Sequence, residues 1–167
     1  IVPTFTFAAT ANSVIYCGAK PVFCDVDKDT FNIIPEEIEK KISDKTKAVI
    51  VVHYGGQSCD MDKIKKITKN NNLHLIEDCA HACGSTYKNK KCGNMGIMGC
   101  FSFYPTKIIT TGEGGMLVLN DDSLADKIRV LRLHGISRDA WKRYGKSGFA
   151  HWELESPGFK YNMADIN

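Results

Sequence analysis

Short apolar runs alternate with helix-like segments along the first half of the chain, and this alternation limits the folds open to it. Thr46–Val52 and Leu73–Asp78 are apolar runs of strand length. Ile34–Ile42 and Met61–Lys69, which precede them, carry apolar residues at helical spacing and polar residues elsewhere. Strands that alternate with amphipathic helices through short connections are typical of βαβ units. The sequence therefore predicts an α/β fold in three layers around a parallel sheet.

The remaining segments predict further helices and strands. Ala8–Tyr16 predicts a helix that ends near Gly18. Asp121–His134 predicts a capped helix whose buried residues are Leu124, Ile128, Leu131 and Val130. Residues 137–156 are polar and contain aromatic residues and glycines. This composition predicts a long excursion of the chain. A strand-like segment, broken by Pro3, is expected at Ile1–Phe7. Further strands are expected at Pro21–Asp25, Ser85–Tyr87, Gly99–Tyr104 and Met116–Leu119.

Size and charge narrow the function classes. The 167 residues are 43% hydrophobic and 25% charged, which is an ordinary globular balance for one domain. The net charge of +3 is spread along the chain, so no electrostatic feature favours nucleic acid or an anionic membrane as a partner. No apolar run approaches the roughly 20 residues that a bilayer span needs. The chain begins at Ile1 within structured-looking sequence, so we expect an internal piece of a longer protein.

Seven cysteines are present, an odd number with scattered spacings, and several lie in apolar runs. This usage favours a reducing, cytoplasmic setting over a disulfide framework. The triplet Cys79-x-His81-x-Cys83 offers metal ligands, but zinc sites usually pair two such halves, and no second half is evident. We therefore expect buried or loop thiols and no metal.

Three residues whose side chains could take part in catalysis or ligand binding lie where apolar strands give way to loops. Asp78 ends one strand, Ser102 lies in the aromatic run Gly99–Tyr104, and Lys107 follows Pro105 and precedes two isoleucines. Ligands of open α/β sheets bind at such strand ends. A desolvated amine at Lys107 would be a usable nucleophile or base. Each residue also has a plain structural interpretation: Asp78 as a turn former, Ser102 as a buried hydroxyl, Lys107 as a surface charge.

A glycine-rich loop, Thr110–Gly115, follows Lys107. It matches neither the dinucleotide-binding fingerprint nor the P-loop pattern. We interpret it as a loop that shapes the wall of the candidate site after Lys107.

Taken together, these motifs resemble the DegT/DnrJ/EryC1/StrS family of pyridoxal-phosphate (PLP) sugar aminotransferases. The matching stretches are Glu77–Gly84, Phe101–Lys107, Thr110–Gly115 and, near the end, Pro157–Asp165, with Pro3–Asn12 and His53–Gln57 upstream. The resemblance runs essentially end to end. It implies the large domain of a fold type I, aspartate-aminotransferase-like transferase, with one antiparallel strand, Met116–Leu119, in a mostly parallel sheet. The lysine at position 107 also differs from related dehydratases, which carry histidine there.

The family's roles map onto this sequence position by position. Lys107 would hold the cofactor covalently and then act as the base that moves a proton between substrate and cofactor. Asp78 would pair with the ring nitrogen and keep it protonated, which makes the ring an electron sink. Ala80 would lie under the ring, and Phe7 would stack on its other face.

Three more positions follow from the same resemblance. Ser102 would bind the cofactor phosphate, and His81 would lie near the ring hydroxyl. Asn162 would reach the phosphate of the neighbouring subunit in a homodimer with a shared site. The family's first phosphate-binding turn and its small C-terminal domain have no counterpart within 1–167, so we expect these residues to form part of the large PLP-binding domain.

The resemblance implies transfer of an amino group from an amino acid, by analogy glutamate, to a nucleotide-linked keto-sugar. His53–Gln57 and Arg138–Pro157 are similar to the branch that acts on 4-keto sugars. Two alternatives stay open at this point. The protein could be a PLP-binding sensor without turnover, or the piece could be too incomplete to bind the cofactor.

Overall fold

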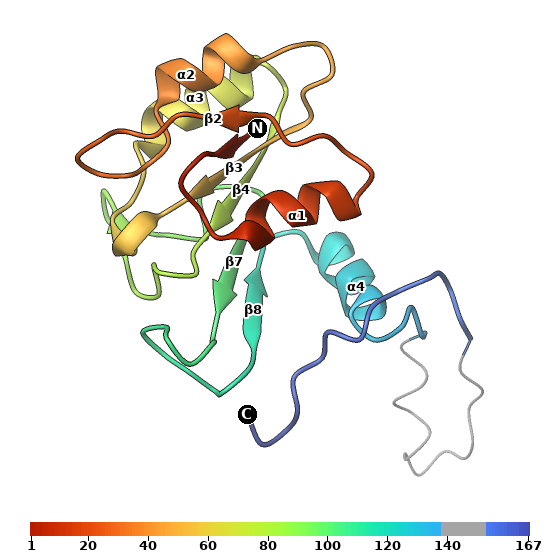
Figure 1. Cartoon of the computed structure of the whole chain (residues 1–167). Coiled ribbons are helices and arrows are strands. Elements are labelled where there is room, and N and C mark those ends of the chain that lie inside the picture. Colours follow the sequence, from red (N-terminus) through yellow and green to blue (C-terminus); the bar gives the residue numbers. More distant parts are fainter. Residues whose placement is uncertain (138–152) are drawn as a thin grey trace. The chain divides into compact units, whose positions relative to one another are not determined.

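The structure is a computed structural model that describes residues 1–137 and 153–167 (Figure 1). The chain divides into two units, Ile1–Leu119 and Asn120–Asn167. The helices of the first unit are α1 (Ala8–Tyr16), α2 (Pro35–Lys41) and α3 (Met61–Asn70), with a short 3-10 turn, η1 (Tyr54–Gly56). Its strands are β1 (Val2–Pro3), β2 (Phe23–Cys24), β3 (Ala48–Val52), β4 (His74–Asp78), β5 (Thr86–Tyr87), β6 (Lys90–Lys91), β7 (Met98–Ser102) and β8 (Gly115–Val118).

The central sheet has the strand order β3-β4-β7-β8. The first three strands are parallel, and β8 is antiparallel to β7. On the other side of β3, the Ile1 carbonyl accepts from the amide of Ile50 at 2.9 Å, so β1 and its parallel partner β2 continue this arrangement. The expected mostly parallel sheet with one antiparallel strand, at Met116–Leu119, is therefore confirmed, with β8 beginning at Gly115.

The register brings the functional residues to one edge of the sheet. Asp78 is the last residue of β4 and pairs with Cys100 of β7, and Ser102 is the last residue of β7 and pairs with Gly115. These are the carboxyl ends of parallel strands, the edge at which ligands of open α/β sheets bind.

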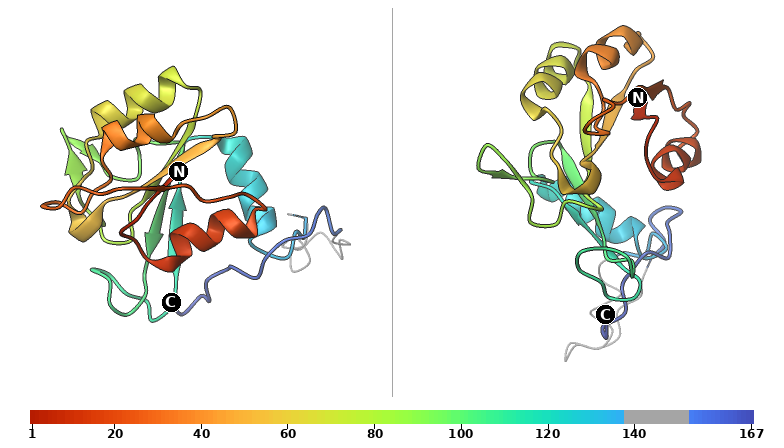
Figure 2. Two further views of the ribbon diagram at one scale, coloured as in Figure 1. Left: turned by 45° about the horizontal axis from the view of Figure 1, so that its top comes forward. Right: turned by 60° about the vertical axis from the view of Figure 1, so that its left-hand side comes forward.

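Helices cover both faces of the sheet. Figure 2 shows α2 and α3 together over one face and α1 over the other. Residues of β4 alternate between these faces, so Leu75 and Glu77 point into the core under α2 and α3, and Asp78 points toward α1. The buried core includes Ile38, Val49, Val51, Met61, Ile64, Ile67 and Leu75.

The two helices over the core begin as the sequence predicts. α2 starts with Pro35, carries Glu36 and Glu37 in its first turn, and buries Ile38. α3 is capped by the Asp60 carboxylate, which accepts from the amide of Lys63 at 3.3 Å. Its buried residues include Met61, Ile64 and Ile67, as expected, and its lysines form the outer face.

Several predicted strands are shorter or paired differently in the structure. The Ile1–Phe7 strand is reduced to Val2–Pro3: it ends at Pro3, the residue expected to break it, and Phe7 is already the N-cap of α1. The Ser85–Tyr87 strand does not join the central sheet. Only Thr86 and Tyr87 of this segment form a strand, β5, which pairs with β6 in a separate hairpin. Lys88 and Asn89 form the turn of this hairpin, with φ of 46° and 68°.

The second unit contains α4 (Asp122–Leu131), whose cap Asp121 accepts from the amide of Leu124 at 2.9 Å. Of the four residues expected to be buried in this helix, Val130 is buried, as predicted, whereas Leu124, Ile128 and Leu131 are only half-buried, which corrects that expectation. Antiparallel bridges join Leu133 to Lys160 and Ile136 to Leu154. Residues 138–152 of the predicted excursion lie outside the described residues.

Among the described residues, no helix is long and apolar enough to cross a membrane.

Candidate active site

One pocket of the first unit collects most of the residues singled out from the sequence. It lies at the carboxyl edge of β4 and β7 and has a volume of about 590 Å³. Five of the expected site residues line it: Phe7, Asp78, Ala80, Ser102 and Lys107. The other lining residues are Ala9, Thr10, Cys100, Phe101, Tyr104, Thr106, Glu113 and Gly114. Residues up to 107 positions apart in the sequence thus meet in one hollow.

Asp78 is held at the pocket by donors on both carboxylate oxygens. The amide of Ala80 donates to Oδ1 at 3.0 Å, and the hydroxyl of Thr10 donates to Oδ2 at 3.1 Å. Its carbonyl accepts from the amide of His53 at 3.1 Å, which continues the pairing of β3 with β4. Asp78 is half-buried, so the carboxylate is fixed by the fold and still borders the pocket.

Lys107 lies in the loop between β7 and β8. The amide of Lys107 donates to the carbonyl of Tyr104 at 2.9 Å, which forms a turn directly after β7. Phe103 anchors the loop: its amide donates to the carbonyl of Gly114 at 2.8 Å, and its carbonyl accepts from the amide of Thr111 at 3.1 Å. The lysine is half-buried at the pocket, as the apolar flanks suggested. Gly114 and Glu113 also border the pocket, which agrees with the interpretation of the glycine-rich loop as a wall.

Phe7, Ala80 and Ser102 complete the lining with an aromatic ring, a small side chain and a hydroxyl. Phe7 precedes α1 and is 80% exposed although it borders the pocket, so its ring is free to contact a flat ligand. Ala80 follows Asp78 in a tight turn. The Ser102 hydroxyl accepts from the amide of Tyr104 at 3.3 Å and retains its own proton for a ligand acceptor.

Two expected site residues lie elsewhere in the described structure. His81 is not among the described lining residues. Its Nδ1 accepts from the amide of Gly55 at 3.4 Å, and its ring packs edge-on against Tyr54 with centroids 5.7 Å apart. Asn162 belongs to the second unit, where its side chain accepts from the Lys160 amine and donates to the carbonyl of Met163 at 3.4 Å. The roles assigned to both residues stay predictions.

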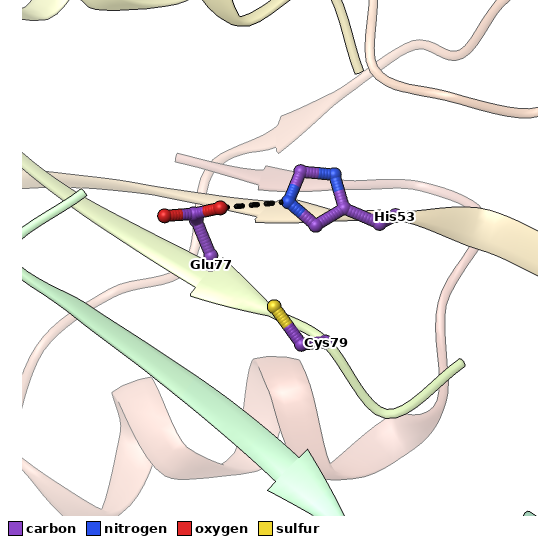
Figure 3. A group of neighbouring side chains, drawn as sticks. All are labelled: His53, Glu77 and Cys79. Atoms are coloured by element: carbon purple, nitrogen blue, oxygen red, sulfur yellow. Dashed lines mark hydrogen bonds and ion pairs between the residues drawn. The ribbon is translucent and has the colours of Figure 1, made fainter. Parts of the chain in front are cut away.

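A buried hydrogen-bonded pair, His53 and Glu77, supports the site from the opposite face of β4. The side chains of His53 and Glu77 are both fully buried, and Nε2 of His53 lies 2.9 Å from Oε2 of Glu77 (Figure 3). Nδ1 of His53 accepts from the amide of Cys59 at 3.2 Å, so Nε2 carries the proton and donates it to Glu77. Residue 77 is adjacent to Asp78 in sequence, which ties this pair to the strand end.

Glu77 also holds the loop that leads into β7. Its carboxylate accepts from the amides of Gly93 at 2.7 Å, Met95 at 2.6 Å and Gly96 at 2.6 Å. Burial pushes the pKa of Glu77 upward, but the hydrogen bonds from His53 and the three amides outweigh it. The pKa of Glu77 therefore lies below its ordinary value of 4.5.

The stability of the protein should depend on pH through this carboxylate. Because the pKa of Glu77 is lower in the folded than in the unfolded chain, its ionised form stabilises the fold above about pH 4.5. That contribution should be lost as the pH falls through the folded-state pKa. Denaturant midpoints measured between pH 3 and 7 should therefore drop below about pH 4.5. Glu77→Gln should show a smaller drop over that range, and an identical pH profile for both proteins would refute the assignment.

The same region contains potential metal ligands. In the described parts of the chain, ligand atoms of His53, Glu77 and Cys79 lie within 4.8 Å of one another (Figure 3). Both ring nitrogens of His53 and both oxygens of Glu77 already make hydrogen bonds to protein groups. Burial raises the pKa of the Cys79 thiol, so the sulfur is protonated at neutral pH and is a poor ligand. The cluster is a satisfied core network. All seven cysteines are free thiols.

A second hollow of about 620 Å³ borders α3 and the start of β4. Its polar lining consists largely of the amines of Lys65, Lys66 and Lys69, beside apolar Leu73 and Ile97. It offers no carboxylate for a cationic ring nitrogen and no aromatic face. The pocket at Asp78 and Lys107 is therefore the better candidate for chemistry.

The donor set of that pocket fits pyridoxal phosphate. A carboxylate held by two donors suits a protonated ring nitrogen, a lysine amine suits the aldehyde, and a hydroxyl suits the phosphate. Phe7 and Ala80 provide the aromatic and the small surface that a flat ring needs. Asp78, Ala80, Phe7, Ser102 and Lys107 would hold the group, with the amine of Lys107 bonded to it.

Sequence reasoning did not assign Thr10 to the site, although its hydroxyl contacts Asp78 directly. Thr10 is the buried residue of α1, with 6% of its surface exposed, in a helix whose other residues are partly or fully exposed. The signal available was its place three residues after Phe7, which puts both residues on the same side of the chain where the helix begins.

The α/β unit with this sheet has the fold of type I PLP-dependent aminotransferases. The chain belongs to the DegT/DnrJ/EryC1/StrS aminotransferase family, whose model matches residues 1–167.

Known proteins are similar to this chain over nearly all of its length. SpsC, the spore coat polysaccharide biosynthesis protein of Bacillus subtilis, is 52% identical over 166 residues, which cover 99% of this chain and 43% of SpsC. GDP-perosamine synthase of Caulobacter vibrioides is 48% identical, over 99% of this chain and 42% of that protein. The structure of Helicobacter pylori PseC, an aminotransferase involved in the biosynthesis of pseudoaminic acid, superposes with a TM-score of 0.88. The identity to PseC is 36%, over 99% of this chain and 42% of PseC. The chain thus spans less than half the length of these relatives.

Proposed function

We propose that the protein is a PLP-dependent aminotransferase that moves an amino group from an amino acid, glutamate, to a nucleotide-linked keto-sugar. The observation that carries this proposal is the pocket in which Asp78, Ser102 and Lys107 meet beside Phe7. Bound pyridoxal phosphate supplies the electron sink through which an amino group is taken from a donor and passed to a ketone. Family membership and the names of the relatives support the reaction class.

Each of these residues has a separate role in the proposed reaction. The Asp78 carboxylate binds and orients the ring nitrogen and keeps a proton on it. Lys107 would hold the aldehyde of the cofactor, and its amine, when free, would move protons at the substrate carbon. Phe7 covers one face of the ring and keeps water away from it. Ser102 binds the phosphate at the end of β7. Each of these roles uses a group that the fold places at the same pocket.

A nucleotide-linked sugar is the proposed acceptor of the amino group. One relative is named GDP-perosamine synthase, and GDP-perosamine is a sugar linked to a nucleotide. This name favours a nucleotide-linked sugar as the acceptor of the amino group. We propose a 4-keto sugar because His53–Gln57 and Arg138–Pro157 are similar to that branch of the family. Within that first stretch, His53 is buried against Glu77, so Tyr54 is the better candidate for substrate contact. Residues 138–152 of the second stretch lie outside the described residues.

We propose a cytoplasmic homodimer with a shared site, and residues 1–167 as part of its PLP-binding large domain. Large apolar side chains at and beside the pocket are exposed: Phe7 at 80%, Ile108 at 67% and Ile109 at 52%. A second subunit would cover them and would bring Asn162 to the phosphate. The seven free thiols suit a reducing compartment.

The experiment uses the full-length protein loaded with PLP. Added glutamate should change the absorbance of the lysine-bound cofactor to that of its amine form. A panel of nucleotide-linked 3-keto and 4-keto sugars should then give an aminated product from a 4-keto member. A protein that binds PLP but aminates no member of the panel would be a sensor instead, and the proposed reaction would be refuted.

A further inference from the structure

The hydroxyl of Thr10 makes a direct contact with the acid of the pocket. Thr10 is the third residue of α1, and its amide donates to the carbonyl of Phe7 at 3.1 Å in the first turn. Its Oγ1 lies 3.1 Å from Oδ2 of Asp78, 68 positions away in the sequence. Thr10 also lines the pocket. The start of α1 therefore sets both the aromatic Phe7 and a hydroxyl against the end of β4.

The direction of this hydrogen bond follows from the groups involved. An ionised carboxylate only accepts, so Thr10 donates its single hydroxyl proton to Asp78. The Thr6 hydroxyl lies 2.7 Å from that of Thr10, whose proton is already in use, so Thr6 must donate to Thr10. The result is a chain from Thr6 through Thr10 to Asp78. In such a chain, each hydrogen bond polarises the next and strengthens it.

The two donors on Asp78 fix the plane of its carboxylate. The amide of Ala80, two residues after Asp78, donates to Oδ1, and the hydroxyl of Thr10, from α1, donates to Oδ2. A carboxylate has about four acceptor positions, so the two that are used leave others for a ligand. Without Thr10, only the donor within the Asp78–Ala80 turn would remain, and the carboxylate could rotate. Thr10 is buried, so water would not readily take the place of its hydroxyl.

We propose that Thr10 is a positioning residue for Asp78. Its hydroxyl, backed by Thr6, holds the carboxylate in the orientation that pairs with the ring nitrogen of bound PLP. This proposal rests on the proposed function, because it assumes that PLP occupies the pocket. It assigns Thr10 and Thr6 a role in setting the protonation of the cofactor, in addition to their place in the fold.

The test compares variants of the full-length protein loaded with PLP labelled with ¹⁵N at the ring nitrogen. Thr10→Val keeps the shape of the side chain and removes the hydroxyl, and Thr10→Ser keeps the hydroxyl. In Thr10→Val, the ring-nitrogen resonance in solid-state NMR should move toward that of an unprotonated nitrogen. The kcat for transamination should fall about 10-fold, as expected for one hydrogen bond to a charged group, with little change in KM. Thr10→Ser should restore the wild-type resonance and rate.

Controls separate this role from a general loss of structure. Ser13→Ala removes another hydroxyl of α1, one that donates to the carbonyl of Thr10 and lies outside the pocket lining, and should leave the resonance unchanged. If Thr10→Val does not fold, Thr6→Val provides the same comparison with a smaller shift, because it removes only the backing donor. An unchanged resonance in Thr10→Val would overturn the positioning role while leaving the proposed function intact. A wild-type protein that binds no PLP would overturn both.

Discussion

Replacement of Lys107 by alanine should abolish the borohydride-stable PLP adduct of the full-length protein and leave its fold intact. The adduct requires a covalent bond between the cofactor and a lysine amine, and Lys107 is the lysine that lines the pocket in the described structure. Transamination should fall by about 10²- to 10⁴-fold from loss of the base alone. Loss of covalent attachment adds to this effect. Absorbance of the reduced adduct and the rate with glutamate measure the two losses.

Two further variants sharpen this expectation. Lys107→Arg retains a cation but cannot form the covalent link, so it should lose the adduct as Lys107→Ala does. Lys90→Ala removes an exposed lysine of the β5–β6 hairpin and should keep the full adduct and rate. Adduct formation that persists in Lys107→Ala would place the reactive amine elsewhere.

Replacement of Glu77 by alanine should destabilise the protein more than any surface substitution. The change leaves His53 and the amides of Gly93, Met95 and Gly96 buried without their acceptor. Breaking a buried hydrogen-bonded pair by removing one partner costs about 3–5 kcal/mol. The loop from Gly93 to Gly96 packs directly on β7, where a Cβ added at Gly99 would lie 2.3 Å from the Cα of Gly93. Loosening of this loop should therefore also disturb the end of β7.

The free energy of unfolding from denaturant titration measures this cost. Glu36→Ala is the matched control, because Glu36 pairs with Lys63 at 2.9 Å on the surface, where both side chains are 58% exposed. Exposed pairs of this kind contribute little to stability, because solvent screens the two charges. A loss for Glu77→Ala no larger than that for Glu36→Ala would show that the buried network does not hold the sheet edge together.

The sequence predicted the sheet class and the helices over its core because burial leaves a periodic trace. Val49 and Val51 of β3 and Ile64 and Ile67 of α3 belong to one buried core cluster, and their regular spacing is visible in the sequence. Strand lengths were less predictable. Pro3 marks the end of β1, but the apolar pattern of the segment continues to Phe7, where α1 begins. The β6 strand was missed because its two lysines carry no strand signal.

The candidate site was predictable where residues follow a strand end, and not where a contact crosses the chain. Asp78, Ser102 and Lys107 were found from their places after apolar runs, and the family resemblance added Phe7 and Ala80. The bonds from Thr10 to Asp78 and from His53 to Glu77 join residues 68 and 24 positions apart. No pattern within either segment indicates these pairings. They depend on the packing of α1 and β3 against β4.

Peptide mapping of the adduct tests the central claim most directly. The full-length protein is loaded with PLP, reduced with borohydride and digested, and the modified lysine is located by mass spectrometry. The pocket predicts a single modified peptide with the phosphopyridoxyl group on Lys107. A specific, saturable modification at another lysine, with Lys107 unmodified, would contradict the account.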